Sequence, residues 1–448
     1  MKKNNIYIVC VVIFCIAVIG VIANYNRKEK ENEVIVYQLL PRKGAAAGTA
    51  EWRDVNNKAT GLISILKQEP SDLNALIRLA ALYIQEARET GNYAYYDKAA
   101  MKSVNKILNI DSLNFNALVY KSLIYLSQHH FAEGLAAAQK AQRVNPYNAY
   151  VYGLMVDGNV ETGHYDSAVA DADRMVSIRP DLTSYSRVSY LREIYGNYKS
   201  AIEAMTMAAE AGGQGDEHTE WTRVQLGSLY EKTGDYKKAA YLYNLSLSMR
   251  PGYPYALAGL ARVAVASNDT KKAIGLYEKA DSLINDNSMK EELVDLYRQA
   301  GQDKKAEEIA NKVIEDLAND AKAGDRDQEI GHYSDRELAY AYLKVNNTDK
   351  AFEHAMLEYN RRPENIDVNE TVAWVYYSKG EYDKAVPYIK AALRTNSKNP
   401  VLLSRAGLIY YKSGEKQLAK SMLQEASVAK SFVGHNLERE AFSAMQRL

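Results

Sequence analysis

The stretch EWTRVQLGSLYEKTGDYKKAAYLYNLSLSMRPGY, residues 220–253, decides the fold of this 448-residue chain. Apolar and small residues recur in it at helical spacing on both sides of a Gly-Asp-Tyr turn, and Pro251 closes it. Gly227 and Ala239 are small where two paired helices approach each other closely, and Tyr243 fills the space beside that contact. The stretch therefore predicts one helix-turn-helix unit of 34 residues.

Small residues and tyrosines return at intervals of 34 positions along the chain. The pairs are Gly227 and Ala261, Ala239 and Ala273, Tyr243 and Tyr277, Ala373 and Gly407, Ala385 and Ala419, Gly380 and Gly414, and Pro146 and Pro180. A period of this length is typical of stacked helical pairs, each of which buries its apolar face against its neighbours. The sequence therefore predicts an all-α solenoid, a fold that usually works as a binding surface.

With these features the chain resembles tetratricopeptide repeat proteins. The resemblance implies a right-handed superhelix of about ten helix-turn-helix repeats. We expect the repeats near residues 73–113, 115–148, 149–181, 182–216, 220–253, 254–286, 287–321, 332–365, 366–399 and 400–433. A glycine-rich segment at 210–218 and a polar segment at 319–328 interrupt the pattern, and we expect both to be loops.

These interruptions divide the chain into segments of different character. Residues 24–50 read as a polar tether that includes a flexible Gly- and Ala-rich spacer. A first sub-array is expected over 51–216 and a second over 217–433, and residues 434–448 are expected to form a capping helix. We expect the angle between the two sub-arrays to flex.

The N-terminus carries an apolar stretch, residues 6–23, without a charged residue. Its 18 residues approach the ~20 that a helix needs to span a bilayer, so we expect residues 1–23 to form an uncleaved transmembrane anchor. A signal peptide cut after Val21 and Ala23, or a lipoprotein modified at Cys15, are the alternatives.

The expected location of the array follows from this anchor. Positive charges on the two flanks nearly balance, and they do not set the orientation. An N-terminal anchor most often leaves the body outside the cytoplasm, so we expect a periplasmic or extracytoplasmic array, or an exported protein after cleavage. The stretches 179–193 and 251–261 also resemble a group of bacterial repeat proteins, which favours a bacterial setting.

Composition argues against several classes of function. Lys plus Arg equals Asp plus Glu, 56 each, which argues against nucleic-acid binding. The two cysteines, Cys10 and Cys15, both lie in the apolar stretch, so neither a disulfide framework nor a Cys-rich metal site is expected elsewhere. The seven histidines are scattered, and the side chains of the adjacent His129 and His130 should diverge on a helix. Phosphate-loop and nucleophile-elbow motifs are absent. We expect no catalytic, cofactor-binding or metal-binding residues, and no enzyme.

A binding groove is implied by the resemblance, because the first helices of such repeats line the concave side of the superhelix. Carried onto this sequence, the groove positions are Trp221, Tyr255, Arg262, Asp295, Arg298, Arg336, Tyr340, Trp374 and Tyr377. Arg and aromatic residues dominate binding hot spots, although each of these side chains could instead pack on the neighbouring repeat.

Two functions remain at this point. The first is a non-catalytic protein-interaction scaffold of the bacterial cell envelope, which binds protein or peptide segments in the concave groove. The alternative is a secreted or periplasmic protein that binds glycan or cell-wall polymer, with its 35 tyrosines and 3 tryptophans as stacking platforms.

Overall fold

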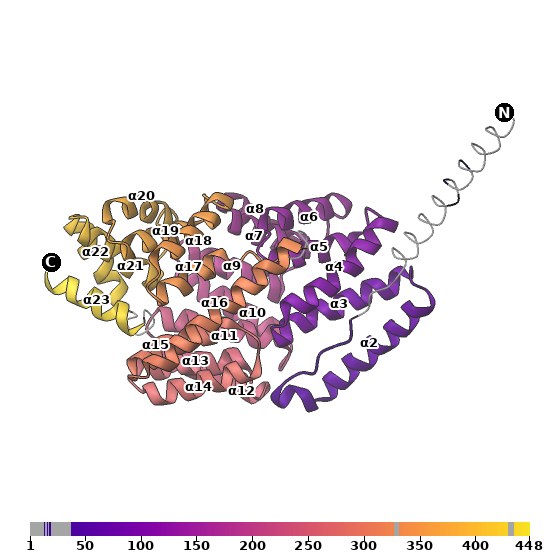
Figure 1. The fold of residues 1–448 in the computed structure, drawn as a ribbon, viewed down its shortest axis with the longest axis horizontal. Helices are drawn as coiled ribbons and strands as arrows, with labels where there is room; N and C mark the ends of the chain where they lie inside the picture. The colour runs from indigo at the N-terminus through magenta and orange to yellow at the C-terminus, as the bar shows by residue number, and fades with distance from the viewer. Residues whose placement is uncertain (1–12, 14–15, 17, 19–36, 327–330, 429–433) are drawn as a thin grey trace, which may run out of the picture.

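The protein is built from helices throughout the part that the structure describes. The computed structural model describes residues 37–326, 331–428 and 434–448, together with 13, 16 and 18. Regular structure within these residues consists of one 3-10 helix and 22 α-helices, without a strand (Figure 1). Their bounds are η1 Gly44–Gly48, α2 Ala50–Gln68, α3 Leu73–Thr90, α4 Tyr93–Ile110, α5 Phe115–Ser127, α6 Phe131–Val144, α7 Ala149–Thr162, α8 Tyr165–Ile178, α9 Leu182–Ile194, α10 Tyr198–Ala211, α11 Glu217–Lys232, α12 Tyr236–Met249, α13 Pro254–Ala266, α14 Thr270–Leu283, α15 Asn287–Gln299, α16 Asp303–Arg326, α17 Asp335–Lys344, α18 Thr348–Arg361, α19 Ile366–Ser378, α20 Tyr382–Ala392, α21 Pro400–Lys412, α22 Lys416–Ala426 and α23 His435–Gln446.

The expected membrane anchor falls almost wholly outside these residues. Of the apolar stretch 6–23, the structure describes Ile13, Ile16 and Val18 only. Among the helices that it does describe, none combines the length and the apolarity needed to cross a bilayer. The anchor therefore stays a prediction from the sequence.

Residues 37–43 pack against the first helical pair, where the sequence suggested a free tether. The backbone N–H of Tyr37 donates to the hydroxyl of Tyr83 at 3.1 Å. Arg42 is only 4% exposed and forms an ion pair of 2.6 Å with Glu86, which is fully buried. A buried tyrosine hydroxyl and a buried carboxylate both need polar partners, and this segment supplies them.

Short turns with a repeated chemistry join the two helices of most pairs. In the unit at 220–253, Gly234 has a φ of 82°, and the Asp235 side chain accepts a hydrogen bond of 3.1 Å from the N–H of Lys238. Asn268 and Asn346 hold positive φ in two later turns. Asn tolerates the left-handed region better than other residues with a side chain, so it can replace glycine there.

Tyr243 shows why small residues recur in the pattern. Its side chain is fully buried, and its ring lies between Gly227 of α11 and Gly259 of α13. A Cβ atom at either glycine would come within 2.5 Å of the ring. The large residue of one helix thus occupies the space that small residues leave on its two neighbours, which is how interlocking helices reach native packing density.

The second turn of the superhelix packs against the first. The backbone N–H of Asn285 donates to the carbonyl of Thr90 at 3.1 Å, and that of Tyr333 donates to Gln128 at the same distance. Further along, the backbone N–H of Ile366 donates to the hydroxyl of Tyr165 at 2.9 Å, and Gly196 lies close to the carbonyl oxygen of Asn396. We call the four contacts Thr90–Asn285, Gln128–Tyr333, Tyr165–Ile366 and Gly196–Asn396 the closing contacts.

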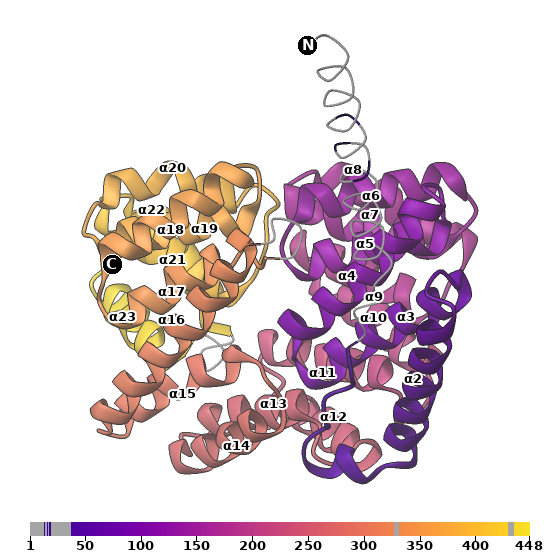
Figure 2. The same cartoon turned by 45° about the vertical axis from the view of Figure 1, so that its right-hand side comes forward.

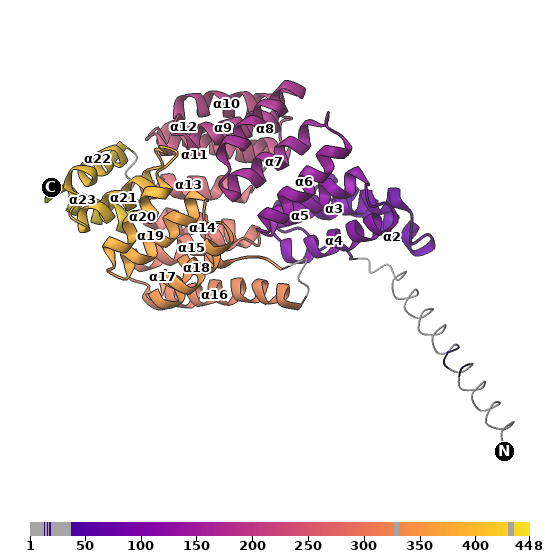
Figure 3. The same ribbon diagram turned by 90° about the horizontal axis from the view of Figure 1, so that it is seen from above.

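The four closing contacts join residues that are 195, 205, 201 and 200 positions apart, close to six times the 34-residue interval. His129 and Tyr333 are 204 residues apart, which is six times the 34-residue interval, so one turn of the superhelix takes six repeats. In Figure 2 the helices α16–α23 face α3–α10, with α11–α15 joining the two sides below, and Figure 3 gives the same arrangement from above. The concave face is therefore enclosed between two successive turns.

Two interruptions expected from the sequence differ from each other in the structure. The segment at 210–218 does join α10 to α11, but Ala208 and Leu226 belong to one apolar cluster that continues across the expected boundary between sub-arrays. The polar segment at 319–328 is helical as far as Arg326, because α16 continues through it. Leu317 anchors α16 in an apolar cluster, and the Ala and Lys residues that follow are strong helix formers.

Candidate functional site

Three of the predicted groove residues, Arg336, Tyr340 and Trp374, lie together on α17 and α19. Arg405 of α21 joins them, since its guanidinium donates to the Tyr340 hydroxyl at 2.8 Å. The same guanidinium lies 5.0 Å above the ring of Tyr340 and 5.1 Å above that of Trp374. Glu370 forms an ion pair of 3.0 Å with Arg405. These side chains form one arginine–aromatic cluster whose charges are matched within the protein.

Trp221 and Tyr255 lie at the other end of the predicted groove. Both are half-buried against the same apolar cluster of α11, α12 and α13. The Arg88 guanidinium lies 5.3 Å from the ring of Trp221 and forms an ion pair with Glu217. The structure thus places Trp221 beside a residue from the first repeat, in addition to the neighbours expected from its own.

The remaining charged groove residues are engaged in ion pairs. Arg262 forms an ion pair of 2.9 Å with the buried Glu231. Asp295 pairs with Lys344 at 2.6 Å, and Arg298 donates to the backbone carbonyl of Lys344. Arg262 stands apart from the other two, whereas Asp295 and Arg298 converge on the end of α17.

Tyr377 points away from the other groove candidates. Its ring stacks on Trp374 at 4.7 Å, and its hydroxyl donates to Glu440 of α23 at 2.5 Å. It is nearly buried beneath that helix, where Met445 and Leu448 also pack on the last repeats. The structure therefore gives Tyr377 a capping role at the end of the array.

An acidic cavity of about 980 Å³ lies between the two superhelical turns. Residues of α4, α5 and α7 line it from the first turn, and residues of α15, α16 and α17 line it from the second. One lysine, Lys98, lies in the lining. The carboxylates of the lining are those of Asp157, Glu161, Asp286, Glu291, Asp316, Asp320 and Glu337.

The carboxylates of the cavity differ in how well their charge is compensated. Asp157 forms an ion pair of 2.6 Å with Arg187, and Glu161 pairs with Arg362, whereas several others lack a full counter-charge. Burial raises the pKa of Glu291 to about 7, against the attraction of Lys344. Burial and the neighbouring Asp316 also raise the pKa of Asp320. Raised carboxyl pKa values in a cavity mark a place where a positive group from outside would be stabilised.

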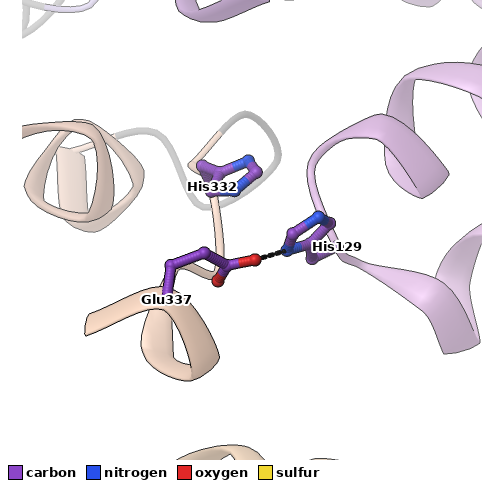
Figure 4. A group of neighbouring side chains, drawn as sticks. All are labelled: His129, His332 and Glu337. Carbon is purple, nitrogen blue, oxygen red and sulfur yellow. Dashed lines mark ion pairs between the residues drawn. The ribbon is translucent and has the colours of Figure 1, made fainter. Parts of the chain in front are cut away.

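His129, His332 and Glu337 converge at one side of this cavity (Figure 4). His129 lies in the α5–α6 turn with a φ of 62°, whereas His332 precedes α17 and Glu337 lies in its first turn. One ligand atom from each residue lies within 4.8 Å of the others. The Nδ1 atom of His129 is 3.7 Å from Oε1 of Glu337, and the two imidazole centroids are 4.3 Å apart.

Burial makes both imidazoles of this cluster neutral at pH 7. It lowers the pKa of His129 to about 4, with the charges of Arg362 and Arg336 adding to the shift, and it lowers that of His332 to about 3, with the neighbouring His129 adding to the shift. His129 and His130 lie in the turn between α5 and α6, not on a helix as expected, and His130 contacts the same segment of the second turn: its Nε2 donates to the Gly331 carbonyl at 2.5 Å, and its ring stacks on Tyr333.

The expectation of no metal-binding residues rested on short sequence motifs, and it stays a prediction. His129 is separated from His332 and Glu337 by one full superhelical turn, so no short motif connects them. The signal available in the sequence is indirect: a 34-residue interval taken six times brings position 129 next to position 333. The number of repeats per turn was not deducible from the residues.

Comparisons with known proteins identify the repeats. Models of the tetratricopeptide repeat match residues 230–289 and 366–399, so the chain carries repeats of this type. No curated protein matches the chain.

Solved structures that resemble this one share little sequence with it. The human IFIT1 dimer with PPP-AAAA is 14% identical, with 76% of this chain and 78% of that chain covered and a TM-score of 0.48. PilW, a widely conserved type IV pilus biogenesis factor, is 15% identical over 44% of this chain and 91% of its own, with a TM-score of 0.37. A tetratricopeptide repeat protein from Parabacteroides merdae is 20% identical over 59% of this chain and 98% of its own, with a TM-score of 0.33.

Proposed function

We propose that this chain is a non-catalytic scaffold of the bacterial cell envelope that binds a segment of a partner protein on its concave face. The observation that carries the proposal is the acidic cavity between the two superhelical turns. Tetratricopeptide repeats suggest a scaffold for protein–protein interaction, and solenoids use their concave surface for binding. The cavity lies on that surface and has seven carboxylates and one lysine in its lining.

The negative charge of the cavity determines which partner segments are favoured. Its lining has seven carboxylates against one lysine, so a partner segment that carries Lys or Arg is favoured there. The cluster of Arg336, Tyr340 and Trp374 supplies a second contact region, where the edges of the aromatic rings can contact apolar side chains. A segment that reaches both regions would be held by charge at one end and by packing at the other.

The glycan-binding alternative receives less support from this geometry. A sugar-binding platform needs a free aromatic face. Trp374 is stacked on Tyr377 with an interplanar angle of 7°, and Arg405 lies over its ring. We therefore retain the protein-binding proposal.

The location and the absence of catalysis belong to the proposal as well. The apolar stretch 6–23 supports an anchor in the membrane, with the array on the extracytoplasmic side. Ion pairs within the chain engage Arg262, Asp295 and Arg405 of the concave face, and we propose that this face binds without chemistry.

Charge reversal within the cavity tests the proposal. We would replace Asp316 and Asp320 of α16 by Lys and measure the binding of fluorescent peptides of equal length that differ in Lys and Arg content. The matched control is Glu315→Lys on the same helix, outside the cavity lining. Basic peptides should bind the parent chain and the control but lose affinity for the double variant. Equal binding to all three chains would contradict the cavity as the binding site.

Cross-linking in native membranes tests the proposed location and partner. The full chain should capture a defined set of proteins that is lost when residues 1–24 are removed. Substituting Trp221 and Trp374 by Ala should also reduce capture, with helical circular dichroism retained. Capture that survives both changes would show that the concave face and the anchor play no part.

A further inference from the structure

We propose that His129, His332 and Glu337 form a binding site for one divalent transition-metal ion, of which Zn²⁺ is the best match. Two imidazoles and one carboxylate are a ligand set that zinc accepts readily. The inference does not depend on the proposed protein partner, because it rests on the geometry of these three side chains alone.

The distances fit a shared ion better than they fit direct pairing. The 3.7 Å between Nδ1 of His129 and Oε1 of Glu337 is too long for a hydrogen bond. Two ligands bound at about 2.0–2.1 Å on a tetrahedral zinc lie a little over 3 Å apart, so a small closing movement suffices. The third ligand atom, from His332, is within 4.8 Å of both.

One carboxylate oxygen of the cluster lacks a partner. Among the described residues, Oε2 of Glu337 is buried without a hydrogen-bond partner, and so are Oε1 of Gln128 and Oγ of Ser334, which are neighbours of the cluster along the chain. Gln128 is only 2% exposed and lines the same cavity. Buried acceptors usually have partners, and an ion bound by Glu337 would supply one.

The chemistry of the surroundings agrees with a cation. Glu291, Asp316, Asp320 and Glu161 line the cavity on which the three ligands open, and they raise the local concentration of cations. Nδ1 of His129 now donates to the Tyr333 carbonyl at 3.1 Å. Metal binding at Nδ1 moves the ring proton to Nε2 and releases that carbonyl. With three protein ligands, the fourth position of the ion opens on the cavity.

The position of the site gives the ion a structural role. His129 belongs to the first superhelical turn, and His332 and Glu337 belong to the second, so the ion would hold the two turns together beside the Gln128–Tyr333 closing contact. An ion that links segments so far apart in sequence constrains the unfolded chain strongly. We infer that metal occupancy stabilises the closed form of the superhelix.

The test uses the full chain, stripped with a chelator and titrated with Co²⁺ and Zn²⁺. We expect one equivalent of Co²⁺ to bind with the absorption bands of a tetrahedral nitrogen and oxygen site, and Zn²⁺ to displace it. Outer-shell changes already weaken metal binding by about 10–100-fold, so the ligand substitutions Glu337→Gln and His332→Ala should weaken it by at least that much. The matched control is His164→Ala, an exposed histidine outside the cluster, which should bind like the parent chain.

Three other results of these titrations would overturn the proposal. Binding that is unchanged in folded Glu337→Gln would assign the ion elsewhere, and thiolate charge-transfer bands would assign it to Cys10 or Cys15. No saturable binding at micromolar metal would exclude the site. Zn²⁺ should also slow amide exchange at residues 127–131 and 331–334 in the parent chain only, which a loss of fold in a variant cannot imitate.

Discussion

The interface between neighbouring repeats and the interface between successive superhelical turns use different chemistry. Neighbouring repeats meet through buried apolar and small residues, such as Tyr243 between Gly227 and Gly259. Successive turns meet largely through hydrogen bonds and ion pairs, such as Arg362 with Glu161, with Ile366 as an apolar contact on the first turn. The first interface repeats every 34 residues and supplies the stability of the array, whereas the second sets how tightly the array is wound.

Loss of a core tyrosine should have the largest effect. Tyr243→Ala leaves a large cavity between α11 and α13 and removes a hydroxyl partner of Glu231, so we expect a loss of about 3–5 kcal/mol in the free energy of unfolding. Denaturant titration followed by circular dichroism measures it. Tyr241→Ala on the same helix, 66% exposed, should change stability by less than about 0.5 kcal/mol. Equal effects would show that the repeat interface is not the stabilising one.

Loss of a buried arginine between the turns should have the second-largest effect on the free energy of unfolding. Arg362 is nearly buried, bridges Glu161 and Glu358, and lies 4.3 Å above the ring of Phe131. Arg362→Ala leaves Glu161 without its counter-charge and Glu358 with Arg361 alone, and we expect a loss of about 3 kcal/mol. Helical content should stay, and the radius of gyration from small-angle scattering should rise. An unchanged radius would mean that this ion pair does not hold the turns together.

Two glycines allow the cost of backbone strain to be distinguished from the cost of a clash between the turns. Gly163 and Gly301 both have positive φ, of 84° and 72°. A Cβ at Gly163 would lie 2.4 Å from the backbone of Glu364, whereas a Cβ at Gly301 meets nothing within 4 Å. Both Ala variants carry strain of about 1 kcal/mol, and Gly163→Ala adds about 1–3 kcal/mol for the clash. Thermal unfolding of the two variants gives the difference, and equal melting temperatures would refute the close contact.

A buried carboxyl predicts a pH dependence near one closing contact. Burial raises the pKa of Asp97 from 3.8 to about 7, and its partners Ser127 and Gln128 lie in the α5–α6 turn. Between these two values the folded chain holds a proton that the unfolded chain has released, so this contribution to stability falls as the pH rises through the window. Asp97→Asn cannot ionise, and its stability relative to the parent should rise by about 1–3 kcal/mol from pH 4 to pH 8. A pH-independent difference would contradict the raised pKa.

The contrast between the two interfaces also explains what could be predicted. The helical pairs follow from residues such as Gly227 and Tyr243, because their packing partners lie within one or two repeats. The closing contacts join positions 195 or more residues apart, such as Gln128 and Tyr333, and depend on the small rotation between neighbouring repeats. That rotation accumulates from many side-chain contacts, and no single residue encodes it.

The candidate site also divides into residues that the sequence predicted and residues that it missed. Arg336, Tyr340 and Trp374 were identified by their positions within repeats and do lie together. The partner Arg405 was missed, because it reaches Tyr340 from α21, two repeats further along. The cavity and its histidine cluster were missed entirely, since their residues come from both turns. A polar helix surface looked solvated in the sequence, as with Glu291, whereas in the structure it lines the cavity between the two turns.

Closure after six repeats restricts how such a chain can change its length. Solenoids commonly gain or lose internal repeats, because each repeat contacts only its neighbours. Here, a duplication inside the span from His129 to Tyr333 would move every later residue along the wound array by one unit. His130 would then face a residue other than Gly331, and all closing contacts that cross the duplication would lose their partners together. Growth at the C-terminal end leaves these partners in place. Copy number inside one turn is therefore fixed by geometry, while the end of the array is free to lengthen.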